Sequence, residues 1–305
     1  MKILLLSRNQ LYKRNWGREL FKQDLSRQHD VIYYGRGYNK NYISNVPDIL
    51  DIHKNQDIIL SYICSYAEGF TNYQMSDIPK VHIDVDYFPY EPGKHDGGNI
   101  DFQNRFYSKA KYNLMFAPTK SMVQDMILNK TAEKVFWLPF SVCIDKYKNL
   151  GLEKTIDVMS SFTMKSHWYP NRGIVHQIIN NLGVKTFTDY VIHDEYIKKI
   201  NESKIFVTNN GIFKCLNMKF TEILACGTLL FADRPEDLDD MGLKDGEHLV
   251  IYKNWKDLKD IIQYYLKHDK EREEIAKNGM NFVRENHNND IRIKEMTDII
   301  QKELL

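Results

Sequence analysis

The chain has 305 residues, of which 43% are apolar and 27% are charged, and its formal net charge is +1. This composition is that of an ordinary globular protein and excludes an intrinsically disordered chain. The length fits two α/β domains of about 150 residues each. No apolar run approaches the roughly 18 residues that a membrane span needs, and the run at residues 3–6 is too short for a signal peptide. We therefore expect a cytoplasmic protein, with peripheral attachment to the inner face of a membrane as an option.

The cysteines and histidines show no spacing that is typical of a metal site. Four widely spaced cysteines form no Cys-x-x-Cys pair, and the ten histidines form no His-Glu-x-x-His pattern. The sequence therefore predicts neither a zinc site nor a disulfide framework. We expect buried thiols in a reducing cytoplasm, at Cys64, Cys143, Cys215 and Cys226.

The small net charge hides a basic N-terminal stretch. Residues 1–40 contain nine basic and three acidic residues, which gives this stretch a net charge of +6. A basic surface of this kind favours an anionic partner or a membrane surface, although a solvated helix face explains the charges equally well.

The first half of the chain alternates apolar runs with amphipathic segments, which is typical of a doubly wound α/β domain. No Gly-x-Gly-x-x-Gly motif follows the first apolar run, so a classical dinucleotide site is disfavoured. We expect strands at 2–7, 31–34, 57–63, 80–85, 112–117 and 135–140. We expect helices at 16–28, after Pro47, at 102–109, and up to residue 129 with Thr119 or Ser121 as its N-cap.

The fourth of these strands carries three polar residues at alternate positions. Alternation places His82, Asp84 and Asp86 on one face, and Asp86 lies at the carboxyl end of the strand, where open α/β sheets bind ligands. We predict that His82 or Asp86 contacts an acceptor or a sugar. The alternative is a strand end with solvated acids, and a metal-binding role for the Asp-x-Asp pattern is disfavoured.

The second half repeats the α/β pattern after a linker at 141–152. We expect strands at 155–161, 185–188, 204–208, 229–232 and 248–252, and helices at 194–202, 255–267, 269–285 and 290–304. Tyr169-Pro170 and Arg172 immediately precede another helix. Helix amides together with Lys165 and Arg172 favour anion binding there, whereas the alternative is a helix started by proline with a surface arginine.

A turn and a short helix follow the strand at 204–208. The turn sequence Asn209-Asn210-Gly211 falls at a carboxyl strand end. A helix at 219–225 then carries Glu222 and ends at Gly227, which suits a left-handed C-cap. Taken alone, Glu222 is more typical of a solvated helix carboxylate than of a site residue.

The pattern Lys219-x-x-Glu222-x-x-Ala225-x-Gly227, an apolar strand and then Asp245-Gly246-Glu247-His248 resembles the C-terminal half of GT-B glycosyltransferases. The resemblance is closest to the CgeB-like branch of glycosyltransferase group 1 and covers the last ninety or so residues best. It implies an α/β GT-B fold, in which two Rossmann-like doubly wound domains face a central cleft. The expected parts are an acceptor-binding domain at 1–145, a nucleotide-sugar-binding domain at 153–288, and a helix at 289–305 that packs back on the first domain.

The resemblance also implies roles for individual residues. The matching glutamate, Glu222, accepts hydrogen bonds from the ribose hydroxyls of a nucleotide-sugar, a role that suits an acceptor-only carboxylate. Many retaining members carry a second glutamate eight positions earlier, where this chain has Lys214. We expect Lys214 or Lys219 to face the diphosphate. The predicted catalytic residues are Lys214, Lys219, Asp86 and His82, and the predicted donor-binding residues are Glu222, Lys165, Arg172, Asn210, Gly211 and Thr221.

The function that the resemblance implies is glycosyl transfer from a nucleoside-diphosphate sugar, with a UDP-sugar favoured as the donor. We expect retention of anomeric configuration, no obligatory metal and no cofactor besides the donor. The expected acceptor is anionic, carbohydrate or lipid-linked. Two alternatives stay open: a DNA-modifying glycosyltransferase of the phage type, and a nucleotide-sugar-binding protein or epimerase on the same fold.

Overall fold

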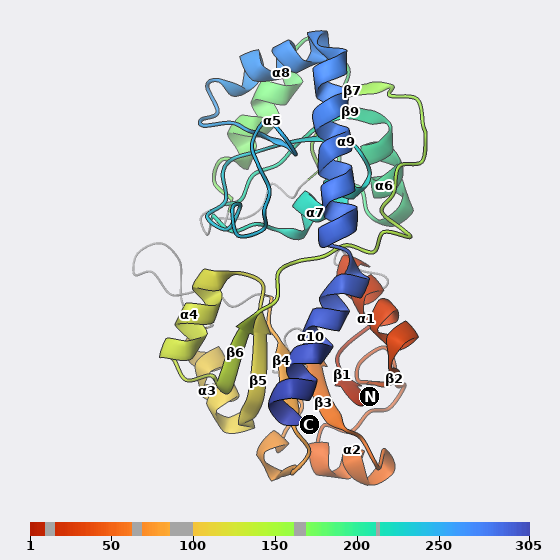
Figure 1. Ribbon diagram of the computed structural model, residues 1–305, viewed down its shortest axis with the longest axis vertical. Helices are drawn as coiled ribbons and strands as arrows, with labels where there is room; N and C mark the ends of the chain where they lie inside the picture. Colours follow the sequence, from red (N-terminus) through yellow and green to blue (C-terminus); the bar gives the residue numbers. More distant parts are fainter. Residues whose placement is uncertain (10–15, 63–68, 86–99, 162–168, 212–213) are drawn as a thin grey trace. The chain divides into compact units, whose positions relative to one another are not determined.

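The computed structural model describes residues 1–9, 16–62, 69–85, 100–161, 169–211 and 214–305 (Figure 1). The chain divides into two compact units. The first unit comprises Met1–Pro139 and Arg292–Leu305, and the second comprises Phe140–Ile291. Each unit has a parallel β-sheet with helices packed against it, as predicted for a doubly wound α/β protein.

The sheet of the first unit has the strand order β2-β1-β3-β4-β5-β6, and every described pair is parallel. Its strands are β1 (Lys2–Leu6), β2 (Asp30–Tyr34), β3 (Ile58–Tyr62), β4 (Lys80–Ile83), β5 (Tyr112–Ala117) and β6 (Ala132–Trp137). The apolar runs of β1 and β3 are buried because a parallel sheet is covered on both faces. The chain passes from β1 to β2 on one side and returns to β3 on the other, so the topological switch point lies between β1 and β3.

The helices of the first unit are α1 (Trp16–Gln28), α2 (Val46–Ile52), α3 (Ile100–Ala110) and α4 (Lys120–Leu128). A single helical turn, η2 (Tyr73–Met75), packs beside α2 and α3. Of the two predicted N-caps of α4, Thr119 is the one whose hydroxyl accepts a hydrogen bond from the backbone N–H of Met122, at 3.2 Å. Most of α10 (Asn289–Leu304) also belongs to this unit, where Lys134 Nζ lies 2.6 Å from Glu303 Oε2.

The sheet of the second unit has the order β11-β10-β9-β7-β8, and its described pairs are also parallel. Its strands are β7 (Ile156–Met159), β8 (Thr186–Phe187), β9 (Ser203–Val207), β10 (Leu229–Ala232) and β11 (Val250–Ile251). The chain leaves β7 for β8 on one side and continues through β9 on the other. The switch point of this sheet therefore lies between β7 and β9.

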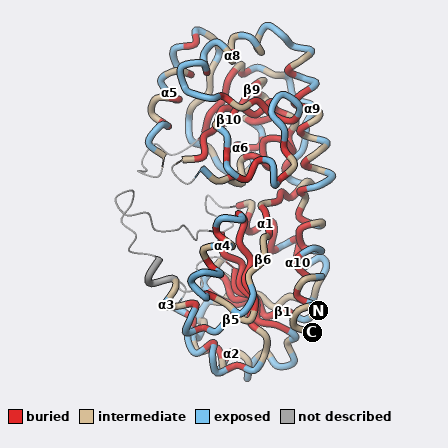
Figure 2. The backbone as a smooth tube through the Cα atoms, turned by 60° about the vertical axis from the view of Figure 1, so that its left-hand side comes forward, coloured by how far each residue is buried: buried red, intermediate tan, exposed pale blue. Residues whose placement is uncertain are grey.

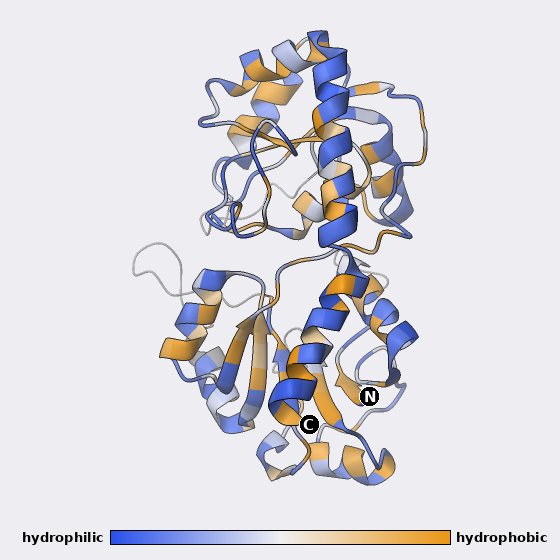
Figure 3. Ribbon diagram, in the orientation of Figure 1, coloured by the Kyte–Doolittle hydropathy of each residue, from blue (hydrophilic) through white to orange (hydrophobic). Residues whose placement is uncertain are grey.

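Five helices of the second unit cover this sheet: α5 (Arg172–Asn180), α6 (His193–Asn201), α7 (Met218–Ala225), α8 (Leu258–Lys267) and α9 (Asp269–Asn286). Side chains of α5, α8 and α9 pack on Ile205 and Phe231 in one apolar core, and the central strands are the buried part of the unit (Figure 2). Apolar residues accordingly mark the strands, whereas the long helix α9 carries many hydrophilic ones (Figure 3). The predicted end of α7 is confirmed: Gly227 has φ +72°, and its N–H donates to Leu224 O at 2.9 Å.

Several predicted boundaries were wrong. Strand β6 starts at Ala132 and ends before Leu138-Pro139, so it lies earlier than 135–140. Strand β11 has only two residues, because a turn in which Gly246 N–H donates to Leu249 O precedes it. Helix α8 begins at Leu258, three residues later than predicted, since the Asn254 side chain holds a turn before it.

The thiols differ in burial. Cys143 and Cys226 are buried as predicted, but Cys215 is half-buried, and Cys64 lies outside the described residues. In the part of the chain that the structure describes, no helix is both long enough and apolar enough to span a bilayer.

Candidate functional site

Polar residues gather at the carboxyl edge of the second sheet, on both sides of its switch point. Ser160 and Ser161 follow β7, residues 208–210 follow β9, and Asp233 follows β10. The register pairs Met159 with Phe206, so the residues after β7 and β9 lie beside one another. Because open α/β sheets bind ligands outside the carboxyl ends of their strands at a switch point, this edge is the candidate site.

Three buried polar atoms at this edge have no hydrogen-bond partner within the described part of the chain. They are Ser160 Oγ, Thr208 Oγ1 and Asn210 Oδ1. The three residues are at most 3% exposed. An unpaired buried polar atom costs about 1–3 kcal/mol, so native structures normally pair such atoms with protein, water or a ligand. These unpaired atoms therefore mark the edge as a candidate site for a polar ligand.

Asn210 is held so that its amide oxygen stays available. Its backbone N–H donates to Asp233 Oδ1 at 2.7 Å, and its side-chain amide nitrogen donates to the Asp233 carbonyl oxygen. Burial raises the pKa of Asp233, and the hydrogen bond from Asn210 N–H partly opposes this shift. The backbone N–H and a side-chain N–H of Asn210 are therefore engaged with Asp233, while its Oδ1 has no partner among the described residues.

Arg172 brings a positive charge to the same edge. It is the first residue of α5 and is only 7% exposed, so the alternative of a surface arginine was wrong. Its Nε donates to Asn209 Oδ1 at 3.3 Å, and its guanidinium carbon lies 3.3 Å from the centre of the Tyr169 ring. These contacts fix a cation at a helix N-terminus, where anions bind. Lys165, the other predicted cation of this segment, lies outside the described residues.

Lys219 belongs to α7, and its side chain reaches the end of β7. The N-cap of its helix is Asn217, whose side-chain oxygen accepts a hydrogen bond from Lys219 N–H at 3.0 Å. Its Nζ donates to Ser161 O at 2.8 Å and to Tyr196 Oη at 3.3 Å. Its ammonium also faces the Phe206 ring of β9, 5.6 Å from the ring centre. Lys219 therefore contributes charge at the switch point and ties α7 to the end of β7.

Glu222 lies one turn further along α7 and is 8% exposed, so the alternative of a solvated carboxylate was wrong. It accepts a hydrogen bond from Tyr147. Burial raises the pKa of Glu222, while Lys219 and the Tyr147 hydroxyl act in the opposite direction. Burial and the nearby Glu222 charge also raise the pKa values of Tyr147 and Tyr196. With Tyr147 as its hydroxyl donor among the described residues, the buried carboxylate keeps capacity to accept further hydrogen bonds.

The predicted donor-binding residues Thr221 and Gly211 and the predicted catalytic residue Lys214 lie close by in the chain but differ in their surroundings. Thr221 is buried, and its hydroxyl donates to Met218 O at 3.0 Å, so that group serves its own helix. Gly211 has φ +72°, which a turn of this kind requires. Lys214 is exposed, has φ +49°, and its carbonyl accepts a hydrogen bond from Glu236 N–H at 2.8 Å.

His82 lies in the first unit, fully buried on β4. Its Nδ1 is 2.7 Å from Ser61 Oγ, and its ring stacks on Tyr112 with centroids 5.1 Å apart. Its Nε2 is 3.7 Å from Asp84 Oδ2, which agrees with the predicted shared face. The catalytic role of His82 stays a prediction, and Asp86 lies outside the described residues.

Sequence reasoning missed several residues of this site, namely Ser160, Thr208, Asp233 and Tyr147. The first three directly follow apolar strands, so the rule that placed Asn210 at a strand end would have found them as well. Tyr147 had no such signal, because it lies in the segment that was predicted to be a linker. Among the described residues, no three His, Cys, Asp or Glu side chains are grouped so that they could hold a metal ion.

Asp237 fixes the loop before α7 and should make stability depend on pH. Its Oδ1 accepts a hydrogen bond from Leu216 N–H at 2.8 Å, while burial raises its pKa from 3.8 to about 6. A carboxyl with a raised folded-state pKa stabilises the fold below its unfolded pKa, and this contribution is lost as the pH rises through 6. Asp237→Asn keeps an acceptor oxygen and cannot ionise. We expect this variant to be about 1–3 kcal/mol more stable than the parent at pH 8 and nearly equal to it at pH 4.

Urea unfolding at the two pH values measures this difference. Asp239→Asn is the matched control, because Asp239 is exposed and pairs with an exposed Arg234. The control should change stability by no more than about 0.5 kcal/mol at either pH. An Asp237→Asn effect of equal size at both pH values would contradict the assignment.

Comparison with known proteins agrees with this fold. Residues 151–298 match a family model described as glycosyl transferase-like. A search of curated protein sequences gives no match. Among solved structures, Anabaena HepE in complex with UDP-glucose has a TM-score of 0.70 at 14% identity, covering 99% of this chain and 100% of that chain.

Two further structures cover nearly the whole chain. Sucrose-phosphate synthase from Thermosynechococcus elongatus has a TM-score of 0.67 at 12% identity and covers 99% of both chains. An alpha-glucosyltransferase in complex with UDP-glucose and DNA containing an abasic site has a TM-score of 0.67 at 11% identity and covers 98% of both chains.

The chain therefore has the GT-B fold. Its residues 151–298, which include most of the candidate site, form a domain of the glycosyl transferase-like family. The predicted GT-B fold is confirmed, and the match to a glycosyl transferase-like domain agrees with the predicted family, while the assignment to the CgeB-like branch stays a prediction.

Proposed function

We propose that the protein transfers a sugar from a UDP-sugar to an acceptor and that the carboxyl edge of the second sheet binds the donor. The observation that carries this proposal is the set of unpaired buried atoms of Ser160, Thr208 and Asn210 beside the Arg172 guanidinium. Hydroxyl and amide groups next to a fixed cation suit a ligand that is both polyhydroxylated and anionic. The structures of HepE with UDP and with UDP-glucose support uridine as the base.

In this proposal, Glu222 binds the ribose of the donor. Its carboxylate already accepts one hydrogen bond from Tyr147 and has lone pairs left for two ribose hydroxyls. Lys219 lies one turn away, and its charge favours the ionised form of Glu222. A carboxylate kept ionised in this way accepts stronger hydrogen bonds than a neutral group does.

Catalysis in this proposal is electrostatic. The diphosphate gains negative charge as its bond to the sugar breaks, and a fixed positive charge stabilises that state more than it stabilises the bound donor. Arg172 and the N-terminal amides of α5 and α7 supply this charge, with Lys219 beside them. We further propose retention of the anomeric configuration and no obligatory metal. The anomeric coupling in the NMR spectrum of the product, and turnover in the presence of EDTA, test these two points.

The experiment that tests the proposal is thermal unfolding against a panel of UDP-, GDP-, ADP-, CMP- and TDP-linked sugars. A donor at about a hundred times its Kd adds roughly 2.7 kcal/mol of stability, which shifts the Tm by a few degrees. We expect a shift with UDP-sugars that exceeds the shift with every other donor. Arg172→Gln should reduce this shift, whereas Lys244→Gln, which changes an exposed lysine, should not. An equal response to all five donors would refute a UDP-specific site.

A DNA acceptor is a second candidate, favoured by the neighbouring alpha-glucosyltransferase solved with DNA and by the basic N-terminal stretch of this chain. Transfer of radiolabelled glucose from UDP-glucose to duplex DNA tests it. A nucleotide-sugar-binding protein or an epimerase would give, respectively, no turnover or a new sugar nucleotide without any acceptor.

A further inference from the structure

A buried tyrosine of the second unit donates a hydrogen bond to the carboxylate of α7. The Tyr147 hydroxyl donates to Glu222, and the two residues are only 3% and 8% exposed. Tyr147 lies before β7, in the segment that the sequence predicted to be a linker. The contact therefore brings a hydroxyl donor from this segment to the group that is proposed to bind the ribose.

Hydrogen bonds within the protein fix the main chain on both sides of Tyr147. Its N–H donates to Cys143 O at 2.9 Å. On the other side, Asn201 Nδ2 donates to Lys148 O at 3.1 Å, and Asn201 Oδ1 accepts from Leu150 N–H at 2.7 Å. Asn201 ends α6 and is 1% exposed. Because protein groups alone make these contacts, the Tyr147 hydroxyl is in place before any ligand binds.

Two protein groups favour the ionised form of Glu222 against the effect of burial. Burial raises the pKa of Glu222, whereas the Lys219 charge and the Tyr147 hydrogen bond lower it. The Lys219 ammonium is itself held, since it donates to Ser161 O at 2.8 Å and to Tyr196 Oη at 3.3 Å. The balance between the ionised and the neutral carboxyl therefore depends on the Tyr147 hydroxyl.

The thiol and the two hydroxyls around this carboxylate stay neutral at pH 7. Burial raises the pKa of Cys226 to about 12 and also raises the pKa values of Tyr196 and Tyr147. Helix α9 packs on α7 as well, and its Arg284 charge acts on the Cys226 thiol, whereas β10 is apolar throughout. Among the described residues, Tyr147 and Lys219 are therefore the groups that lower the pKa of the carboxyl.

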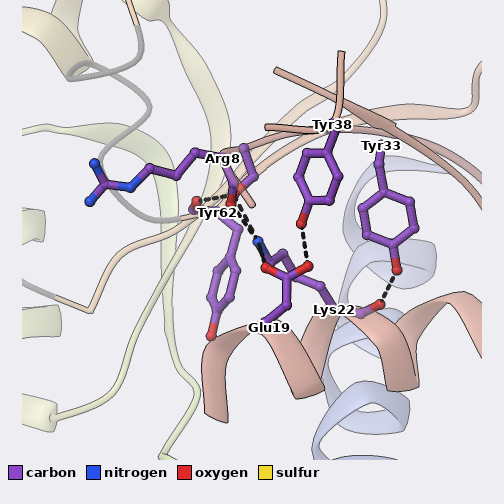
Figure 4. Close-up of polar contacts among 7 residues, drawn as sticks. Arg8, Glu19, Lys22, Tyr33, Tyr38 and Tyr62 are labelled. Atoms are coloured by element: carbon purple, nitrogen blue, oxygen red, sulfur yellow. Dashed lines mark hydrogen bonds and ion pairs between the residues drawn. The ribbon is translucent and has the colours of Figure 1, made fainter. Parts of the chain in front are cut away.

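A buried glutamate of the first unit has the same two kinds of partner (Figure 4). Glu19 Oε2 lies 2.6 Å from Lys22 Nζ, and Glu19 Oε1 accepts a hydrogen bond from the Tyr38 hydroxyl. Both oxygens of Glu19 thus face a protein donor. At Glu222 the lysine acts through its charge and the tyrosine through a hydrogen bond, so the carboxylate keeps capacity for ligand hydroxyls.

We propose that Tyr147 is a positioning residue of the donor site and that its hydroxyl holds Glu222 in the ionised, acceptor-only form that ribose hydroxyls need. This inference rests on the proposed function, because it requires that Glu222 binds the ribose. A protonated carboxyl carries an O–H of its own and has fewer acceptor positions than a carboxylate. The affinity for UDP-glucose therefore falls when Glu222 becomes protonated, and Tyr147 sets the pH at which this happens.

Calorimetric titration with UDP-glucose at pH 8 and at pH 5 tests the proposal. When the ionised form of a group binds the ligand, affinity is lost as the pH falls through the pKa of that group. Tyr147→Phe removes a contact that lowers this pKa, so the loss should begin at a higher pH. We expect the affinity of Tyr147→Phe to be within about threefold of the parent at pH 8 and roughly three- to tenfold below the parent at pH 5.

Tyr264→Phe is the matched control, because the exposed Tyr264 hydroxyl also donates to a glutamate of the second unit, Glu271, at 2.9 Å. This control should follow the parent at both pH values. A Tyr147→Phe protein that loses the same factor of affinity at pH 8 and at pH 5, or that follows the parent at both, would overturn the positioning role. The Tm of each variant at each pH shows that the folded proteins are compared.

Glu222→Gln separates this inference from the proposed function. The amide cannot ionise, so we expect weaker binding with little dependence on pH, and adding Tyr147→Phe should not restore that dependence. If Glu222→Gln behaves in this way while Tyr147→Phe follows the parent, only the positioning role is wrong. If Glu222→Gln binds as the parent does at both pH values, the ribose assignment is wrong. A parent that binds no UDP-sugar would refute the proposed donor site and this inference with it.

Discussion

Glu222→Ala is expected to weaken UDP-sugar binding by a hundredfold or more, while the protein stays folded. The carboxylate is proposed to accept two ribose hydroxyls, and each hydrogen bond to a charged group contributes roughly 1.5–3 kcal/mol. Burial raises the pKa of Glu222, so its removal also relieves the cost of a buried charge and should not unfold the chain. Calorimetric titration with UDP-glucose measures the affinity of each variant, and its Tm measures whether it stays folded.

Three variants distinguish ribose binding from a purely structural role of Glu222. Tyr147→Phe removes the protein donor of Glu222 and should keep most of the affinity, because the ribose contacts remain. Glu222→Gln retains one acceptor oxygen and should bind with intermediate affinity. Glu236→Ala changes an exposed glutamate of the same unit and should bind like the parent. If Glu222→Ala binds UDP-glucose as the parent does, the ribose assignment is wrong.

Gly279→Ala is expected to destabilise the protein by about 3 kcal/mol, which is at the upper end of the usual cost of overpacking. Gly279 lies within α9, and a Cβ atom there would be 2.2 Å from His248 O and 2.9 Å from Leu224 Cδ2. Backbone atoms of the β11 turn cannot move aside as a flexible side chain does. Helix α9 must therefore shift away from α7, the helix that carries Glu222.

Gly173→Ala is the matched control, because Gly173 is also helical and a Cβ there meets no atom within 4 Å. The replacement should raise the free energy of unfolding by about 0.5–1 kcal/mol through helix propensity. Urea unfolding monitored by circular dichroism compares the two variants. A Gly279→Ala protein as stable as the Gly173→Ala protein would show that α9 does not pack closely against the His248 backbone.

The sequence alone specified the strands and helices that have strong local signals. The β1 run is apolar at nearly every position, which only a strand covered on both faces tolerates, and β1 was placed within one residue. Helix α7 ends at Gly227 as predicted, because glycine adopts the left-handed conformation of a C-cap at little cost in free energy. Boundaries failed where side chains build turns, as Asn254 does before α8, because such hydrogen bonds depend on the local conformation rather than on periodicity.

The candidate site was recognised from its sequence pattern only in part. Glu222, Arg172 and Asn210 were found because they follow motifs or strand ends. Their burial was not recognised: a surface position was the alternative for Arg172, yet its side chain contacts the Tyr169 ring and Asn209. The contact between Tyr147 and Glu222 joins residues far apart in the chain, and no local pattern reports such a contact.

What the sequence determined by itself was the α/β class, the position of most elements and the helix that carries Glu222, because these follow from apolar periodicity and the conformational freedom of single residues. What only the tertiary structure decided was the strand order, the two switch points and the groups that meet there. Strand order brings the residues that follow β7 beside those that follow β9, through pairing between distant segments. Such pairing depends on the packing of the whole unit, so the chemistry of this edge becomes visible only once the sheet is formed.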